Sequence, residues 1–230
     1  MVEALDLCRA LVKDGITTVV ATPHQLGRYE RRNTSARIRN AVVELERELE
    51  RNAIPLEIVP GADVRIDERI PRLFDEDSIV TVADVRCHVL LELPHELLVD
   101  MAPTIAALRE RGVQTIVTHP ERYRYLRGEI ELLRSWTMAG AVLQITAGSL
   151  LGDFGGQAFE QAWQLVREGH VELVATDSHD SQHRPPRLTK ALDRLTIEIG
   201  SAAAAAMAVE NPLKVFEGVP IGHAWSLSND

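Results

Sequence analysis

Six residues of metal-ligating type stand at or just after the ends of short apolar segments in this sequence. Three are histidines and three are carboxylates: His24, Asp63, Glu92, His119, Asp177 and His179. Nitrogen and oxygen donors without sulfur suit Mn²⁺, Zn²⁺ or Fe²⁺, and shared carboxylates permit more than one ion. The set therefore predicts a site for divalent metal ions.

The sharpest local pattern is Asp177-Ser178-His179, which follows the apolar run LVAT. In an extended segment, residues two apart share a face, so both side chains can reach one site. Any one histidine taken singly is more typical of a hydrogen-bonded loop residue. The shared position of His24, His119 and His179 after apolar segments favours the metal interpretation for the three together.

Two arginines accompany these candidate ligands. Arg122 lies three residues past His119, and Arg184 lies five residues past His179. Guanidinium groups match phosphate oxygens bidentately, and metal ions combined with arginines are typical of phosphoryl transfer. Surface ion pairing is the alternative role for both arginines.

A basic stretch lies further toward the N-terminus and comprises Arg28, Arg31, Arg32, Arg37 and Arg39. A solvated loop and helix face is the simplest interpretation of this stretch. Its positive charge would also draw an anionic substrate toward the site.

The segments that carry these residues alternate between strand and helix patterns. Strands are predicted over 16–21, 56–59, 89–93, 113–118, 142–146 and 171–175. Helices are predicted over 2–14, 34–51, 100–111, 129–139, 156–168, 187–198 and 201–217. Gly112, Gly140 and Gly169 each separate a helix from the next strand, where a left-handed helix end is expected.

Repeated strand-then-helix units with short connections predict an α/β fold, with a parallel sheet and helices outside it. A barrel and a doubly wound sheet both fit this order. The carboxyl ends of parallel strands point the same way, so the candidate ligands would converge on one face, where barrels keep their active sites. No linker, repeat or charge block divides the chain, and we expect one domain over residues 1–230.

Composition excludes several classes of protein. The 25 basic residues face 34 acidic ones, and the net charge of −9 is opposite to that of a typical duplex-binding domain. No apolar run approaches the ~18–20 residues of a membrane span, and charged residues interrupt the N-terminal segment where a signal peptide would be apolar. Two cysteines without metal-binding spacing suit a reducing compartment. We expect a cytoplasmic protein that is not membrane-inserted and binds no nucleic acid.

Other catalytic motifs are absent from the sequence. A cysteine phosphatase needs an arginine six positions after its nucleophile, but Asp14 and Leu93 stand six positions after Cys8 and Cys87. The nucleophile elbow, the Walker A loop and the dinucleotide fingerprint are also absent. Metal-assisted chemistry is the class that the residues favour.

A family resemblance extends this interpretation over residues 3–217. The segments that carry it are GITTVVATPH, VPGAD, VLLELP, TIVTHPERY, QITAGSLLGDFG, ATDSHDSQHRPP and ENPLKVF. In this order and spacing they resemble the bacterial PHP-type manganese-dependent protein-tyrosine phosphatases (CpsB/CapC-like) of capsule and exopolysaccharide gene clusters. The resemblance implies a distorted (β/α)7 barrel of the PHP type, similar to a TIM barrel.

The resemblance also implies roles for single residues. His24, Glu92, His119, Asp177 and His179 match metal-site residues of the family, and Asp63 stands where the family has glutamate. Arg122 and Arg184 match its phosphate-binding arginines. The implied cofactor is Mn²⁺, with two or three ions in the intact site and Fe or Zn as alternatives. The implied partner is the phosphotyrosine tail of a bacterial tyrosine kinase of polysaccharide assembly, and a homo-oligomer is compatible with the resemblance.

The sequence departs from the family pattern at two places. Family members open with a strand that carries His-x-His, and this sequence contains no His-x-His. We therefore expect the first barrel strand and two metal ligands to be lacking, through a misplaced start or a truncation. Asp63 in place of glutamate shortens a bridging carboxylate by one methylene.

Three functions remain open from the sequence. The leading hypothesis is metal-dependent hydrolysis of protein phosphotyrosine that regulates capsule or exopolysaccharide production. A small-molecule phosphoesterase that resembles histidinol phosphatase is the second. The third is a phosphotyrosine-binding regulator without catalysis, which the absence of His-x-His favours.

Overall fold

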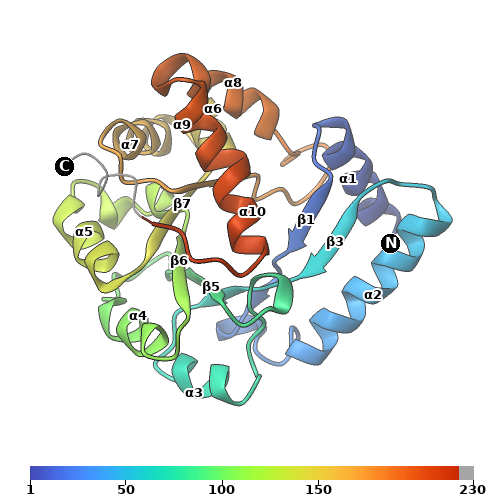
Figure 1. Cartoon of the computed structure of the whole chain (residues 1–230), viewed down its shortest axis with the longest axis horizontal. Helices are drawn as coiled ribbons and strands as arrows, with labels where there is room; N and C mark the ends of the chain where they lie inside the picture. Colours follow the sequence, from blue (N-terminus) through green and yellow to red (C-terminus); the bar gives the residue numbers. More distant parts are fainter. Residues whose placement is uncertain (223–230) are drawn as a thin grey trace.

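The computed structural model describes residues 1–222 (Figure 1). Its strands are all parallel and form two sheets. One sheet pairs β1 (Thr18–Ala21) with β3 (Glu57–Pro60). The other has the order β2-β4-β5-β6-β7-β8, made of β2 (His24–Gln25), β4 (Asp63–Arg65), β5 (His88–Glu92), β6 (Gln114–Thr118), β7 (Val142–Thr146) and β8 (Leu173–Ala175). The predicted α/β architecture with parallel strands is confirmed.

Helices connect the strands and cover them. They are α1 (Val2–Lys13), α2 (Ser35–Arg51), α3 (Ile70–Asp75), α4 (Ala102–Arg109), α5 (Ile130–Ala139), α6 (Ala147–Leu151), α7 (Gly156–Arg167), α8 (Leu188–Ile199), α9 (Ser201–Ala205) and α10 (Asn211–Phe216). Short 3₁₀ turns η1 (Gly27–Tyr29), η2 (Val82–Asp84), η3 (Pro120–Arg122) and η4 (Arg124–Leu126) join some of them. Gly112, Gly140 and Gly169 all have positive φ, as predicted for helix ends.

Each of the first two predicted strands is followed by a second, short strand that the sequence analysis did not predict. The strand predicted over 16–21 forms β1, and after Pro23 the chain enters β2. The strand predicted over 56–59 forms β3, and after Gly61 the chain enters β4. Proline cannot donate to a strand ladder, and a Cβ on Gly61 would meet Val20 Cγ1 at 2.5 Å. His24 and Asp63 therefore lie within strands rather than after them.

The last predicted helix, over 201–217, forms three helical segments in the structure. A π-helical turn, η5 (Ala206–Glu210), separates α9 from α10. Pro212 lies in the first turn of α10, and a proline removes one donor from the helical ladder. The short helices α3 and α6 were not predicted from the sequence.

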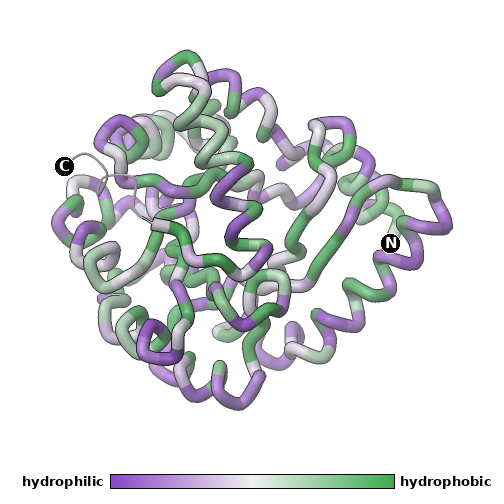
Figure 2. The backbone as a smooth tube through the Cα atoms, viewed as in Figure 1, coloured by the Kyte–Doolittle hydropathy of each residue, from purple (hydrophilic) through white to green (hydrophobic). Residues whose placement is uncertain are grey.

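The main hydrophobic core lies between the larger sheet and the helices around it. Leu91, Tyr123, Leu126 and Trp136 are almost fully buried members of this core. A separate cluster packs α1 and α2 against β1 and β3, through residues such as Leu11, Leu49 and Ile58. Figure 2 shows hydrophobic colour along the inner strands and hydrophilic colour over much of the outer helices. Among residues 1–222, no helix combines the length and apolar content that a bilayer crossing requires.

We predict that Leu91→Ala lowers the free energy of unfolding by about 2–5 kcal/mol, because it opens a cavity beside β4 and β6. Leu97→Ala is the matched control, since Leu97 is 64% exposed whereas Leu91 is 0% exposed. Urea denaturation of the three proteins measures the difference. Equal midpoints for the two variants would contradict the assigned core.

Candidate functional site

Strand register places the first candidate ligands side by side. His24 of β2 is the register partner of Asp63 of β4, and Arg65 of β4 is the register partner of Glu92 of β5. His119 follows β6, the next strand along the sheet. Three neighbouring strands and the end of a fourth thus deliver these side chains to one edge of the sheet.

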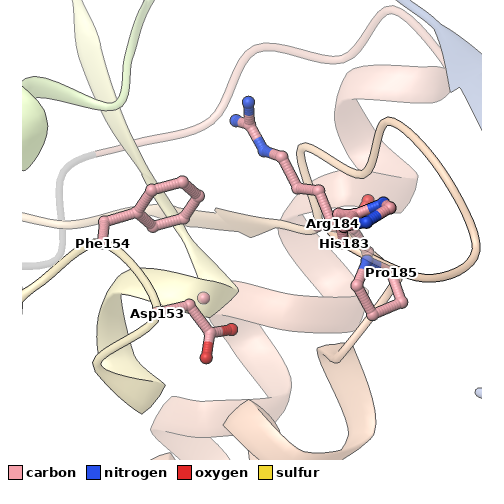
Figure 3. A pocket seen from close by; sticks show the side chains of 7 residues that line it. Asp153, Phe154, His183, Arg184 and Pro185 are labelled. Atoms are coloured by element: carbon pink, nitrogen blue, oxygen red, sulfur yellow. The ribbon is translucent and has the colours of Figure 1, made fainter.

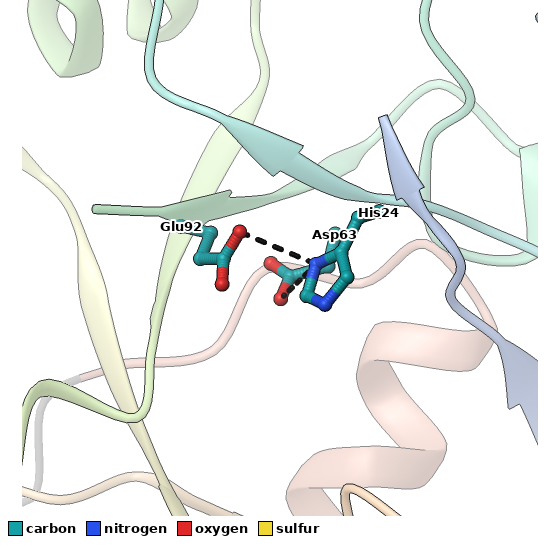
Figure 4. Close-up of side chains that lie close together, drawn as sticks. All are labelled: His24, Asp63 and Glu92. Atoms are coloured by element: carbon teal, nitrogen blue, oxygen red, sulfur yellow. Dashed lines mark ion pairs between the residues drawn. The ribbon is translucent and has the colours of Figure 1, made fainter. Parts of the chain in front are cut away.

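The side chains of His24, Asp63, Glu92 and His119 converge there. His24 Nδ1 lies 3.2 Å from Glu92 Oε2 and 3.7 Å from Asp63 Oδ2. His119 Nε2 lies 3.6 Å from Asp63 Oδ2 and 3.9 Å from Glu92 Oε1. Figure 4 shows His24, Asp63 and Glu92 pointing toward one another, with one ligand atom from each within 4.8 Å of the others. We call these four residues the metal cluster.

The metal cluster buries two carboxylates with few hydrogen bonds. Glu92 is 2% exposed and Asp63 is 7% exposed. His24 Nδ1 and Glu92 Oε2 are buried and lack a hydrogen bond of good geometry, although they face each other. Buried polar atoms normally have hydrogen-bond partners. The short distance between these two atoms without a hydrogen bond fits a cation that would coordinate both. The donor set of nitrogen and oxygen atoms fits a divalent ion of the Mn²⁺, Fe²⁺ or Zn²⁺ type.

Electrostatics inside the metal cluster agrees with this interpretation. The contact with Glu92 raises the pKa of His24, and the charge of Asp63 acts in the same direction. Burial alone would raise the pKa of Glu92, but contact with His24 and the charges of Arg65 and His119 lower it below its usual value. Positive charge therefore stabilises the Glu92 carboxylate, and a metal ion would supply more of it.

Backbone conformation at two candidate ligands is unusual. His119 has φ 38° and ψ 50°, and Asp177 has φ 46°. Residues other than glycine rarely adopt left-handed conformations, and such strain concentrates at functional sites. Both residues follow a strand end, so the sharp turn directs the side chain back across the edge of the sheet.

Asp177 is held by the two predicted arginines. Arg122 Nη1 donates to Asp177 Oδ2 at 2.5 Å, and Arg184 Nη2 donates to the same oxygen. His179 Nδ1 lies 3.7 Å from Asp177 Oδ1, and the rings of His179 and His24 are 6.5 Å apart. The structure thus brings Asp177 and His179 beside the metal cluster, where Asp177 contacts guanidinium groups.

The same two arginines contact Phe154, which the sequence reasoning did not select. The ring centroid of Phe154 lies 4.4 Å from Arg122 Cζ and 5.0 Å from Arg184 Cζ. These distances are within the range of cation–π attraction. Gly148 makes room for the ring, because a Cβ there would approach Phe154 to 2.9 Å. Phe154 therefore contacts both guanidinium groups and helps to orient them.

A small pocket opens beside this arrangement (Figure 3). Asp153 and Phe154 form one wall of it, and Arg184 and Pro185 lie opposite. Its complete lining is Gly148, Asp153, Phe154, Thr176, His183, Arg184 and Pro185. The pocket gives an anion direct access to Arg184, whose pKa is lowered because of burial.

Sequence reasoning also missed Arg65 and Glu121. Arg65 Nη2 lies 3.1 Å from Glu92 Oε2 and adds a third arginine to the site. Glu121 is buried and accepts hydrogen bonds from Thr146 N and Ser149 Oγ, at 3.0 and 2.7 Å. It therefore fixes the turn after His119 to the start of α6. The two-residue spacing places Arg65 on the same strand face as Asp63, but its contact with Glu92 depends on strand register. The sequence around Glu121 is polar and gives no signal of its burial.

The site combines two groups of residues with different chemical roles. The metal cluster can hold a divalent cation, and Arg122 with Arg184 can donate several hydrogen bonds to a tetrahedral anion. Both guanidinium groups donate to Asp177 Oδ2, so their N–H groups already converge on one oxygen atom. The arrangement suits binding and hydrolysis of a phosphate ester.

Comparison with known proteins places this geometry among relatives. Residues 1–217 match the family model described as "Capsular polysaccharide synthesis, CpsB/CapC". The tyrosine-protein phosphatase YwqE of Bacillus subtilis (strain 168) is 32% identical over 201 residues, which are 86% of this chain and 78% of that protein. The tyrosine-protein phosphatase CpsB of Streptococcus pneumoniae is 22% identical over 219 residues, 93% of this chain and 89% of that protein.

A solved structure agrees with these sequence matches. It comes from the crystal structures of YwqE from Bacillus subtilis and CpsB from Streptococcus pneumoniae, described there as unique metal-dependent tyrosine phosphatases. The TM-score is 0.91 at 29% sequence identity, and the match covers 96% of this chain and 89% of that chain. The likeness extends over nearly the whole described fold.

We predict that Glu92→Gln weakens binding of Mn²⁺ by about tenfold or more, because it removes a buried charged ligand. Metal content after dialysis against Mn²⁺, measured by mass spectrometry, checks this. Glu96→Gln is the matched control, since Glu96 is an exposed glutamate four residues away. The same metal content in all three proteins would show that Glu92 is not a ligand.

Proposed function

Because the chain belongs to the CpsB/CapC family of capsular polysaccharide synthesis, we propose that it hydrolyses phosphotyrosine on proteins in a metal-dependent reaction. The observation that carries the proposal is the position of Arg122 and Arg184 on a single carboxylate oxygen beside the metal cluster. Named relatives that are tyrosine-protein phosphatases support it further.

The proposed ligands of the metal ions are His24, Asp63, Glu92 and His119, joined by Asp177 and His179. Mn²⁺ is the proposed ion. A divalent ion at this position supplies positive charge for the phosphate and makes water more acidic. The two buried carboxylates of the metal cluster give the ion a high affinity, and the histidines complete a nitrogen and oxygen donor set.

The arginines bind the substrate phosphate in this proposal. Arg122 and Arg184 donate to the non-bridging oxygens, where negative charge builds up as the ester bond breaks. Phe154 keeps both guanidinium groups oriented through ring contacts. In the net reaction, the oxygen of water bonds to phosphorus while the bond to the tyrosine oxygen breaks, and one proton of the water ends on the tyrosine oxygen. The leaving phenolate, with a parent pKa of ~10, needs less protonation than an alkoxide would.

The proposed substrate is the phosphotyrosine tail of a tyrosine kinase of polysaccharide assembly, and the reaction would regulate capsule or exopolysaccharide production. We place it in the cytoplasm. Cys8 and Cys87 are both free thiols, which agrees with a reducing compartment.

We predict hydrolysis of p-nitrophenyl phosphate and of a phosphotyrosyl peptide with Mn²⁺, and its loss after chelation. Arg122→Ala should lower kcat/KM about 100-fold, as the loss of one charge-stabilising donor does in other enzymes. Arg127→Ala is the matched control, because Arg127 is an exposed arginine in a weak surface ion pair.

Two outcomes of this assay would contradict the proposal. Faster turnover of histidinol phosphate than of the phosphotyrosyl peptide would indicate a small-molecule phosphoesterase. Tight binding of the peptide without turnover, in the Mn²⁺-loaded protein, would indicate a phosphotyrosine-binding regulator.

A second prediction concerns Phe154. Phe154→Ala should raise KM for p-nitrophenyl phosphate about tenfold and also lower kcat, because two cation–π contacts that position the charge-stabilising arginines are lost. Phe154→Tyr should retain the wild-type KM. Phe159→Ala is the control, since Phe159 packs against Trp163 and does not contact the arginines. A wild-type KM for Phe154→Ala would remove the positioning role.

A further inference from the structure

A loop between β2 and α2 forms part of the rim of the metal cluster. The ring of Tyr29 stacks on the ring of His24 with centroids 5.3 Å apart. Leu26 anchors the start of the loop in the core, and the Asn33 side chain donates to the backbone oxygen of His24 at 2.7 Å. The loop is therefore attached to the site at both of its ends and through Tyr29.

This loop carries positive charge that the protein does not neutralise. Arg28, Arg31 and Arg32 are exposed, and none of them forms an ion pair with any residue in the range 1–222. We call these three residues the basic loop. Many other arginines of the chain are paired with carboxylates, as Arg39 is with Asp77 and Asp84.

The acidic residue within the loop does not cancel this charge. Glu30 is paired with Arg69 at 2.9 Å, and Arg69 is also paired with Asp67. Arg37 of α2 donates to the backbone oxygens of Arg31 and Arg32, so it adds a fourth cation and fixes the loop backbone. The backbone that carries these arginines is therefore fixed, and the loop keeps a net positive charge.

The position of the basic loop limits what it can contact. Arg28 Cζ lies 4.8 Å from the Tyr29 centroid, and that centroid lies 5.3 Å from the His24 ring. The Arg28 guanidinium is thus no more than about 10 Å from the metal cluster, the length of about three residues of extended peptide. A group that contacts Arg28 would be a near neighbour of the phosphotyrosine in the substrate chain, and Arg31 and Arg32 follow three and four residues further along the loop.

Charge complementarity indicates that the substrate group in contact with the basic loop is negatively charged. The chain as a whole has a net charge of −9, so uncompensated arginines beside the site stand out against an acidic background. The phosphate itself is assigned to Arg122 and Arg184, which leaves the basic loop available for other negative charges. Localised positive charge selects and steers an anionic partner without adding contacts to the reacting group.

We propose that the basic loop binds acidic side chains that flank the phosphotyrosine within about three residues in a protein substrate. This inference rests on the proposed function and names a substrate feature that the same site would select. Because the arginines are exposed, the interaction acts mainly on the capture of the substrate and weakens with salt.

The test compares two phosphotyrosyl peptides of equal length, one flanked by glutamates and one by glutamines, with p-nitrophenyl phosphate as the third substrate. The proteins are wild type, the variant Arg31→Gln/Arg32→Gln, the variant Arg28→Gln, and Arg47→Gln. Arg47 is an exposed arginine of α2 outside the loop and serves as the matched control. Binding of each fluorescent peptide is measured in parallel by anisotropy at low and high salt.

We expect wild type to prefer the glutamate peptide by about tenfold in kcat/KM at low ionic strength, and high salt to reduce this preference. The double variant should lose most of the preference and keep its turnover of p-nitrophenyl phosphate, which also shows that it folds. Equal kcat/KM and equal binding for the two peptides in wild type would overturn the inference, as would a preference that persists in the loop variants.

The assay also separates this inference from the proposed function. Turnover of p-nitrophenyl phosphate without a preference for the glutamate peptide overturns the inference about the basic loop and leaves the proposed function in place. Absence of turnover on all three substrates overturns the proposed function and this inference with it. If an unphosphorylated glutamate peptide binds as tightly as the phosphorylated one, the loop is a general site for acidic ligands, and the inference is overturned.

Discussion

The structure depends on one electrostatic constraint: two carboxylates are buried at the edge of a parallel sheet and need positive charge around them. Glu92 and Asp63 receive this charge from His24, His119 and Arg65, at distances between 3.1 and 3.9 Å. Burial of like charges is unfavourable unless cations compensate them. A divalent ion coordinated by the same atoms is the strongest compensation that this donor set allows.

A third carboxylate, that of Asp177, lies beside the metal cluster and is compensated by arginines. Asp177 contacts Arg122 and Arg184, and the ring of Phe154 lies within cation–π distance of both guanidinium groups. The carboxylates of the metal cluster carry negative charge, and the guanidinium groups of the neighbouring arginine pair carry positive charge. Together they can hold a metal ion and a phosphate next to each other, which is the physical basis of the proposed hydrolysis.

Much of this could be predicted from the sequence. Alternating apolar runs predicted the parallel α/β architecture, and the histidines and carboxylates at their ends predicted convergence at one edge. The short strands β2 and β4, which follow Pro23 and Gly61, could not be predicted, because their formation depends on which sheet each segment joins. The role of Arg65 follows from strand register with Glu92, and the role of Phe154 follows from ring contacts across the chain; periodicity indicates neither.

The most direct test of the central claim is anomalous diffraction at the manganese edge, from crystals of this protein grown with Mn²⁺ and inorganic phosphate. We predict an anomalous peak within coordination distance of His24, Asp63, Glu92 and His119, together with phosphate oxygens on Arg122 and Arg184. A peak elsewhere in the molecule, or the absence of a peak among these four side chains at saturating Mn²⁺, would contradict the account.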